Sequence, residues 1–266
     1  MTGKIKVRPA LPLWQRLRRR WRAWRGAGLC KTHVVDFVQI GSARLKRVRF
    51  ADPSQAQAVA ESLEQFADSG CFPALLMRQG PQLWVDYVPG APPRLEDAVA
   101  RGRLVDFFVR LYTHRPALAA DPGPAAGQLD RDLDFLNRCG VIESDRAADL
   151  TRQAHALRPE RVWSGPDYAD PLAKNFILQT DRAVGIDIEA LLPNAPLGTG
   201  LAKAWLRWPF DPAPEVMAQV VSVGGPDLNE QWPWVRLCFL CEYFRQKVLQ
   251  GKPGYIRVEM LDRVAR

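Results

Sequence analysis

The sequence predicts a two-lobed α+β protein, with a small β-rich N-terminal lobe and a larger helical C-terminal lobe. Strand-like segments and one helix fill residues 29–90, which we take as the N-lobe. A break rich in Pro and Gly, "VPGAPP", follows at once, and beyond it apolar residues recur at helical spacing. We therefore expect an N-terminal arm over residues 1–28 and a helical C-lobe over residues 91–266.

The N-lobe should contain an antiparallel sheet and one helix. "THVVDFVQIG" and "ARLKRVRF" predict two strands joined by a turn at residues 41–42, and "FPALLMRQG" and "QLWVDYVPG" predict two more. Lys46 shares a strand face with Val48 and Phe50, so its ammonium should lie at the edge of an enclosed space. Residues 53–68 open with Pro and Ser and predict the helix.

The C-lobe pattern is helical with one exception. "LEDAVARGRLVDFFVRLYTHR" and "LDRDLDFLNRCGVIESDRAADLTRQAHAL" predict helices separated by a loop of Pro, Gly and Ala. Residues 197–266 return to helix, with Pro/Gly turns at 209–214 and 224–226. Between these regions "NFILQTDRAVGIDIEA" predicts a hairpin with strands at 176–178 and 184–188.

Length and charge set the class of protein. The chain has 266 residues, 47% of them hydrophobic, and can bury a sizeable core. Its formal charge of +8 favours an anionic partner such as a nucleotide, a phosphorylated sugar, a nucleic acid or a membrane surface. No apolar run reaches the roughly 18 residues of a membrane span, and no secretory signal begins the sequence. We expect a cytoplasmic protein.

The excess charge is concentrated in the N-terminal arm. Residues 1–28 carry nine Lys or Arg and no acid. Residues 12–25 place Leu and Trp at helical spacing among arginines, a pattern typical of a helix that lies on an anionic membrane surface. The alternative is an arm that packs its tryptophans on the domain. Nucleic acid is disfavoured, because no basic, aromatic-rich platform recurs later.

The cysteines predict packing, not chemistry. Five cysteines at irregular spacing argue against a disulfide framework and for a reducing compartment. Cys238 and Cys241 form a C-x-x-C within an apolar helix, without the further ligands that zinc needs. We expect them in the core.

Three oxygen-bearing side chains punctuate "DYADPLAKNFILQTDRAVGIDIEAL". Asn175 enters the first strand of the predicted hairpin, Asp187 lies near the end of the second, and Asp170 begins the preceding loop. The turn folds Asn175 and Asp187 toward each other. Mg²⁺ takes carboxylate and amide oxygens and shares its other positions with phosphates, while a free Asp can accept a proton from an attacking hydroxyl. The set is what phosphoryl transfer requires.

Each of these residues also has a structural alternative. Asp170 before a proline could form a turn, Asn175 could cap a loop, and Asp187 could bond backbone at a strand end. Lys46 could be a solvated edge-strand lysine, and Glu61 could lie on a solvated helix face. The joint arrangement of Asp170, Asn175 and Asp187 favours the functional interpretation of those three residues.

The same residues resemble a known family. "DPLAKNFIL" followed by "GIDIE" resembles the catalytic loop and metal-binding strand of the protein-kinase-like phosphotransferases, in the aminoglycoside and choline kinase type or the lipopolysaccharide core-sugar kinases. The resemblance implies a two-lobed protein-kinase-like fold. It also implies that Asp170 is the catalytic aspartate and that Asn175 and Asp187 are the magnesium ligands.

Upstream segments fit the same order. "RLKRV" is similar to the strand that carries the phosphate-binding lysine, which makes Lys46 that lysine. Glu61 is the best match to the helix glutamate that pairs with it, and Glu64 is the next. "WVDYVPGAP" resembles the hinge that holds adenine, and "FFVRLYTHRP" resembles the helix before the catalytic loop. The resemblance covers about residues 44–191.

Two departures accompany the match. Tyr168 stands where the family has a histidine two positions before the catalytic aspartate, and a single glycine in "QIGSARLK" replaces the Gly-rich loop. The expected function is ATP- and Mg²⁺-dependent phosphorylation of a hydroxyl on a small polar or sugar acceptor, such as a lipopolysaccharide core sugar at the inner membrane face. The departures favour an alternative, a catalytically inactive kinase-like module that binds a partner or membrane. A third alternative is a basic scaffold associated with membrane or nucleic acid.

Overall fold

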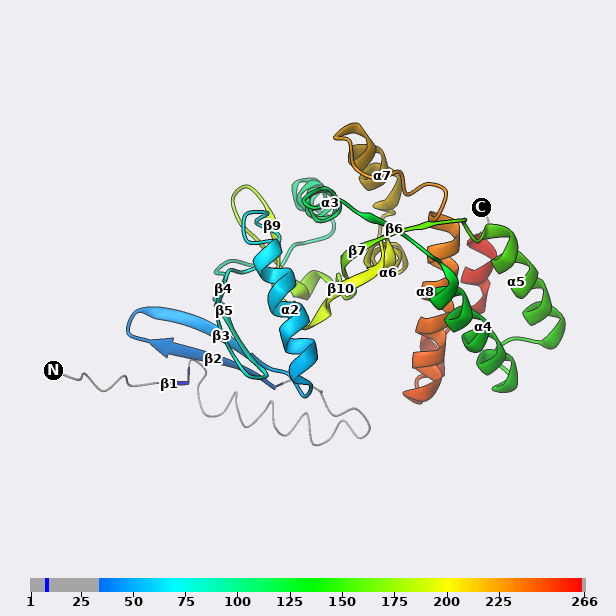
Figure 1. Ribbon diagram of the computed structural model, residues 1–266, viewed down its shortest axis with the longest axis horizontal. Coiled ribbons are helices and arrows are strands. Elements are labelled where there is room, and N and C mark those ends of the chain that lie inside the picture. Colours follow the sequence, from blue (N-terminus) through cyan, green and yellow to red (C-terminus); the bar gives the residue numbers. More distant parts are fainter. Residues whose placement is uncertain (1–7, 10–33, 265–266) are drawn as a thin grey trace. The chain divides into compact units, whose positions relative to one another are not determined.

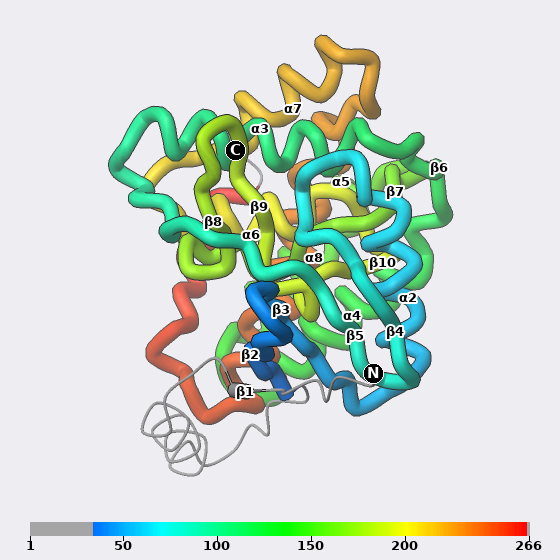
Figure 2. The backbone as a smooth tube through the Cα atoms, turned by 90° about the vertical axis from the view of Figure 1, so that its left-hand side faces the viewer, coloured from blue at the N-terminus to red at the C-terminus, as the bar shows by residue number. Residues whose placement is uncertain are grey.

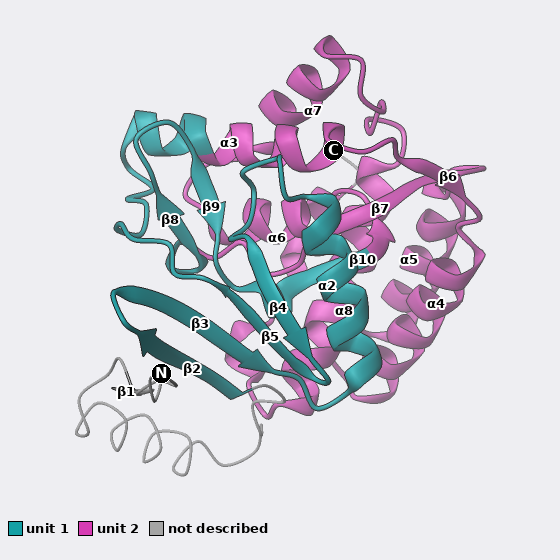
Figure 3. Cartoon of the chain, turned by 60° about the vertical axis from the view of Figure 1, so that its left-hand side comes forward, with its two compact units in different colours: residues 1–103, 173–193 teal, residues 104–172, 194–266 magenta. Residues whose placement is uncertain are grey.

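The computed structural model describes residues 8–9 and 34–264, which fall into two compact units (Figure 3). Unit 1 contains residues 1–103 and 173–193, and unit 2 contains residues 104–172 and 194–266. Unit 1 is rich in strands and unit 2 is mainly helical, which confirms the predicted fold class. Unit 1 extends past residue 90, the expected end of the N-lobe, to residue 103. It also includes the hairpin that was expected in the C-lobe.

Unit 1 is built on a five-stranded antiparallel sheet of order β1-β2-β3-β5-β4. Its strands are β1 (Arg8–Pro9), β2 (Val34–Ile40), β3 (Ala43–Arg49), β4 (Leu75–Gln79) and β5 (Gln82–Asp86). The last four agree with the predicted strands. β1 was not predicted, and it lies within the expected arm. The rest of the arm, including residues 12–25, lies outside the described residues.

One helix packs on this sheet. The helix α2 (Pro53–Gln65) runs along β4 and β5 (Figure 1). The Asp52 carboxylate caps it by accepting a hydrogen bond from the Ser54 amide at 2.8 Å. Val59 and Leu63 are buried on the sheet side. The helix was predicted where it is found.

The hairpin of unit 1 consists of β8 (Phe176–Leu178) and β9 (Ala183–Gly185), visible side by side in Figure 2. Short 3₁₀ turns flank it, η1 (Ala173–Asn175) and η2 (Ile188–Ala190). The second strand ends three residues before the predicted end. The Ala190 amide donates to the Asp187 carbonyl at 2.9 Å, so the backbone turns there and does not continue as a strand.

The predicted hinge crosses β8 at Gly90. Its φ of +138° is a conformation that favours glycine. A Cβ there would lie 2.5 Å from Ile177 Cγ2 and 2.8 Å from the Leu178 carbonyl oxygen. The Leu178 amide donates to the Ala91 carbonyl at 3.0 Å. Gly90 thus lets the hinge backbone pair with the hairpin.

Unit 2 is formed by helices from the regions where helices were predicted. They are α3 (Ala98–Thr113, which begins in unit 1), α4 (Gly123–Arg138), α5 (Ser144–Leu157), α6 (Thr199–Arg207), α7 (Ala213–Ser222) and α8 (Trp232–Leu249). The helices α4, α5 and α8 pack against one another (Figure 1). Leu136, Leu150 and Phe244 are fully buried among them.

A small sheet of order β10-β7-β6 was not predicted. Its strands are β6 (Leu118–Ala120), β7 (Val162–Tyr168) and β10 (Leu191–Pro196). β6 and β10 are short and contain Ala, Asn and Pro, which have low strand propensity. Pairing with β7, not local sequence, makes them strands.

The two cysteines of α8 pack in the core, as predicted. Cys241 is fully buried and Cys238 is partly buried in α8, and all four described cysteines are free. Burial raises the pKa of both α8 thiols, so neither is a thiolate at neutral pH. Among the described residues, no helix combines the length and apolarity that crossing a membrane requires.

Candidate active site

Lys46 is a buried cation of unit 1. Strand alternation puts it on the inward face of β3 with Val48 and Phe50, as predicted, and all three are buried. Its Nζ donates to the Ile186 carbonyl at 2.7 Å and to Glu189 Oε2 at 3.2 Å. The lysine is therefore held by the segment that follows β9.

The carboxylate that pairs with Lys46 is Glu189, not the expected Glu61. Glu61 is exposed on α2 and accepts a hydrogen bond from Gln57. The Lys46–Glu189 pair is enclosed, with side chains 11% and 12% exposed. Sequence reasoning missed this role, although Glu189 stands two residues after Asp187 in the motif.

The electrostatics of this pair extend to Asp187. Burial by itself would raise the pKa of the Glu189 carboxyl, but the Lys46 ammonium and then a hydrogen bond with the Asp187 side chain lower it below its usual value. Lys46, Glu189 and Asp187 thus form one connected polar group inside unit 1.

Asn175 lies at the same end of the hairpin. It is buried at the end of η1, just before β8. The Ile186 amide donates to the Asn175 carbonyl at 2.8 Å, which sets Asn175 opposite the residue that precedes Asp187. The structure therefore brings Asn175 and Asp187 to one end of the hairpin in unit 1.

The side-chain oxygens of Asn175 and Asp187 at this end of the hairpin suit a hard divalent cation. A carboxylate and a carboxamide present only oxygen ligands, the type that Mg²⁺ takes. Over residues 34–264, no three His, Cys, Asp or Glu side chains cluster as a protein-only metal cage would need. Mg²⁺ commonly uses one or two protein ligands and completes its shell with water and substrate phosphates.

Asp170 belongs to unit 2, just after β7. Its Oδ1 lies 2.5 Å from Lys203 Nζ on α6, with both side chains partly exposed. The loop that carries it is fixed at two points. The Leu172 amide donates to the Asp170 carbonyl at 2.8 Å, and Trp208 Nε1 donates to the Pro171 carbonyl at 2.7 Å.

A second aspartate, Asp167, anchors the strand that leads to this loop. It accepts hydrogen bonds from the Tyr168 amide at 2.7 Å and the Tyr112 hydroxyl at 3.2 Å. It also accepts from the Gly198 and Gly200 amides at the start of α6, at 3.0 and 3.1 Å. A helix N-terminus stabilises such an anion. Sequence reasoning did not identify Asp167, whose partners lie up to 55 residues away.

Burial dominates the titration of Asp167. It raises the pKa of the carboxyl from 3.8 to about 6, against the lowering effect of the hydrogen bonds from Gly200, Tyr168 and Tyr112. Burial and then the Asp167 charge raise the pKa of Tyr112, so its phenol keeps the proton that it donates.

Tyr168, the residue at the family's histidine position, is fully buried. Its ring meets Phe107 edge-on, with centroids 5.6 Å apart. Gly200 packs against the backbone of Tyr168. A Cβ on Gly200 would lie 2.1 Å from the Tyr168 carbonyl oxygen, so only glycine fits there. Packing with Phe107 and Gly200, together with Asp167, positions this part of the chain.

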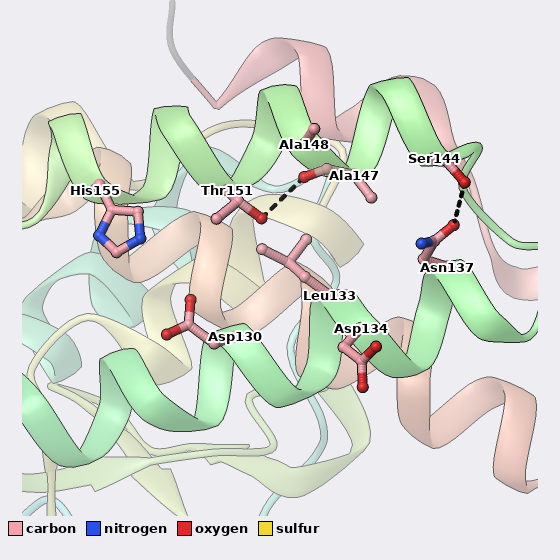
Figure 4. A pocket seen from close by; sticks show the side chains of 9 residues that line it. All are labelled: Asp130, Leu133, Asp134, Asn137, Ser144, Ala147, Ala148, Thr151 and His155. Carbon is pink, nitrogen blue, oxygen red and sulfur yellow. Dashed lines mark hydrogen bonds between the residues drawn. The ribbon is translucent and has the colours of Figure 1, made fainter.

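A groove of about 480 Å³ lies elsewhere in unit 2, between α4 and α5 (Figure 4). Figure 4 shows Asp130 and Asp134 projecting from α4, with His155 and Thr151 on the α5 side. None of the sequence-predicted site residues lines it. The groove is therefore separate from the candidate site.

Comparison by sequence finds no relatives. No protein-family model matches the chain, and no curated protein is significantly similar to it. Similarity to known proteins is found at the level of the fold.

Several solved structures have the same fold. The choline kinase LicA from Streptococcus pneumoniae aligns over 96% of this chain and 98% of its own, at 12% identity and a TM-score of 0.60. A type I macrolide 2'-phosphotransferase aligns over 96% of both chains at 12% identity, with a TM-score of 0.58. An aminoglycoside phosphotransferase from Alicyclobacillus acidocaldarius covers 90% and 85%, at 13% identity and a TM-score of 0.57. The chain thus has the protein-kinase-like fold of the small-molecule phosphotransferases.

Proposed function

We propose that the protein transfers the γ-phosphoryl group of ATP to a hydroxyl of a small acceptor. The observation that carries this proposal is the connected group of Lys46, Glu189 and Asp187 in unit 1, beside Asn175. Binding of a nucleoside triphosphate requires a cation for its phosphates and oxygen ligands for a hard metal ion, and this group offers both. The fold of the chain supports it, because the similar structures are those of kinases and phosphotransferases.

In unit 1, the proposed roles concern the nucleotide. Lys46 binds the phosphates, and Glu189 keeps its ammonium oriented in place of Glu61. Asn175 and Asp187 hold Mg²⁺, which when bound neutralises phosphate charge. Residues 88–93, the hinge, receive the adenine.

In unit 2, Asp170 orients the acceptor. Its carboxylate accepts a hydrogen bond from the acceptor hydroxyl, whose oxygen attacks the γ-phosphorus. The bond between that phosphorus and the β–γ bridging oxygen breaks, ADP leaves, and the hydroxyl proton passes to Asp170 and then to water. Lys203 sets the direction of the Asp170 carboxylate.

The finer proposal is a sugar acceptor at the inner face of the cytoplasmic membrane, such as a lipopolysaccharide core sugar. The basic, Trp-bearing sequence of residues 12–25 supports it, because such sequences bind anionic lipid surfaces. A soluble sugar or amino alcohol is the alternative acceptor.

Three variants test the proposed roles. Asp187→Ala should abolish the thermal stabilisation that Mg-ATP confers on the native chain. Asp170→Asn should keep that stabilisation and lower kcat by about 10²- to 10⁴-fold, the usual contribution of proton transfer. Asp181→Ala, in the exposed turn of the same hairpin, is the matched control and should change neither.

The same measurements separate the rival interpretations. Unchanged Mg-ATP stabilisation in Asp187→Ala would refute the metal assignment. Mg-ATP binding without ADP release under any acceptor would support the inactive kinase-like module instead. Binding to membranes or nucleic acid that survives Asp170→Ala and is lost on deleting residues 1–28 would support the scaffold.

A further inference from the structure

The candidate catalytic aspartate of unit 2 lies beside a cluster of positive charges. Lys203 and Arg207 are four residues apart on α6, so they share one helix face. Lys203 contacts Asp170 at 2.5 Å, which places this face at the catalytic loop. Arg207 is exposed. The helix α6 packs against α8, which adds further cations (Figure 1).

Lys247 is the contribution of α8. Its Nζ lies 4.8 Å from the ring centre of Tyr243 and 5.6 Å from that of Tyr255. Two aromatic faces thus hold the ammonium in place. The Lys252 amide donates to the Lys247 carbonyl at 2.9 Å, so the chain turns and keeps Lys252 near the same helix end.

The Lys247 ammonium interacts electrostatically with the other basic residues of this region. Burial lowers the pKa of the Lys247 ammonium, three nearby cations lower it further, and Asp170 opposes them. The three cations are Lys203, Lys252 and Arg207. We call these four basic residues the α6–α8 basic cluster.

The nearby acids neutralise this cluster only in part, through Lys203. Asp170 faces Lys203, and Glu242 on α8 also interacts with Lys203. Asp132, the next acid on this side, is already bound by Arg245 at 2.7 Å and by Gln128 at 2.6 Å. An unneutralised group of like charges costs free energy, and a bound anion removes that cost.

We propose that the acceptor is itself an anion, and that its phosphate group binds the α6–α8 basic cluster while its hydroxyl reaches Asp170. This inference rests on the proposed phosphotransferase function and names the acceptor class of the same site. Several neighbouring cations suit a dianionic phosphate better than a singly charged carboxylate. Arg207 and Lys247 bind the phosphate, and Lys203 joins it to the catalytic loop.

The acceptor charge is tested with matched sugars. Glucose, glucosamine, glucuronate and glucose 6-phosphate offer similar hydroxyls with neutral, positive, carboxylate and phosphate groups. ADP release should have the highest kcat/KM with glucose 6-phosphate, then glucuronate, and the lowest with glucosamine. Equal or better turnover of glucose or glucosamine would overturn the proposal, and a preference for glucuronate over glucose 6-phosphate would replace phosphate by carboxylate.

The site is tested with variants that spare Asp170. Arg207→Ala and Lys247→Ala should each raise KM for glucose 6-phosphate at least about tenfold, the effect of losing one charge-assisted contact, with kcat little changed. Lys247→Arg should restore most of the loss. Arg138→Ala, an exposed basic residue on α4, is the control. Lys203 is left intact because it also orients Asp170.

A binding measurement separates this inference from the proposed function. Inorganic phosphate without ATP should raise the Tm of the native chain, and Arg207→Ala combined with Lys247→Ala should remove that shift. If the double variant loses the phosphate-induced rise in Tm, but the native chain never consumes ATP, the phosphotransferase function is refuted and the anion site is retained. Turnover of sugars with an unchanged phosphate shift in the double variant would refute the anion site and retain the function.

Discussion

Asp167 shows how one buried carboxylate can organise a loop at a distance. Its two oxygens bind amides at the end of β7 and at the start of α6, together with the Tyr112 hydroxyl. This ties together the two segments that carry Asp170 and Lys203.

Asp167 should also make stability depend on pH. The folded chain keeps the Asp167 proton up to pH about 6, whereas the pKa of an unburied Asp carboxyl is 3.8. Between these values the folded state binds more protons than the unfolded state, so the contribution of Asp167 is fully present at low pH and is lost as pH rises to about 6. This difference between the folded and unfolded pKa of Asp167 corresponds to roughly 3 kcal/mol of unfolding free energy.

Asp167→Asn removes this titration. We expect the variant to be less stable than the native chain, with a deficit in unfolding free energy that shrinks as pH rises from 4 to 7. Urea unfolding of both chains at several pH values measures it. A deficit that stays constant or grows with pH would contradict the assignment of a raised pKa to Asp167.

At the scale of elements, the contact between α6 and β7 depends on Gly200. A methyl group there meets the Tyr168 carbonyl oxygen and the Asp167 carboxylate, and the carboxylate is held in place by hydrogen bonds. Gly200→Ala should therefore lower the free energy of unfolding by at least about 1–3 kcal/mol, the usual cost of overpacking. It should also lower turnover, because the Asp167 contacts position the catalytic loop.

Gly102→Ala is the matched comparison. Gly102 lies inside α3, and a Cβ there meets nothing within 4 Å. Alanine should stabilise the helix by about 0.5–1 kcal/mol. Thermal or urea unfolding of the two variants should give shifts of opposite sign. Equal shifts would show that the close approach at Gly200 is not what limits the substitution.

What the sequence could predict at this scale follows the range of the interaction. Alternation along β3 placed Lys46 correctly, and hydrophobic period located α2, the hairpin and the helices of unit 2. The partner of Lys46 could not be read this way. Glu189 is 143 residues from Lys46, and nothing local distinguishes it from Glu61. Strands β6 and β10 were missed for the same reason, because their pairing with β7 outweighs a weak local preference.

At the scale of the whole molecule, the N-terminal arm should act as a membrane contact. Replacing the five arginines of residues 16–22 by glutamine should abolish sedimentation with vesicles that contain anionic lipid, since each basic residue contributes about 1 kcal/mol there. Binding of the native chain should weaken with added salt. Turnover of a soluble acceptor should not change. Retention of vesicle binding by the variant would assign the contact to another part of the chain.

The path of the chain between the units also matters for how this protein can be handled. The backbone passes from one unit to the other at residues 103–104, 172–173 and 193–194. A gene shortened after residue 103 would therefore encode the five-stranded sheet without the β8–β9 hairpin. Lys46 would then lack the counter-charge that Glu189 supplies. Expression of either unit alone calls for a rearranged open reading frame that joins its separate segments, because no simple cut of the coding sequence yields a whole one.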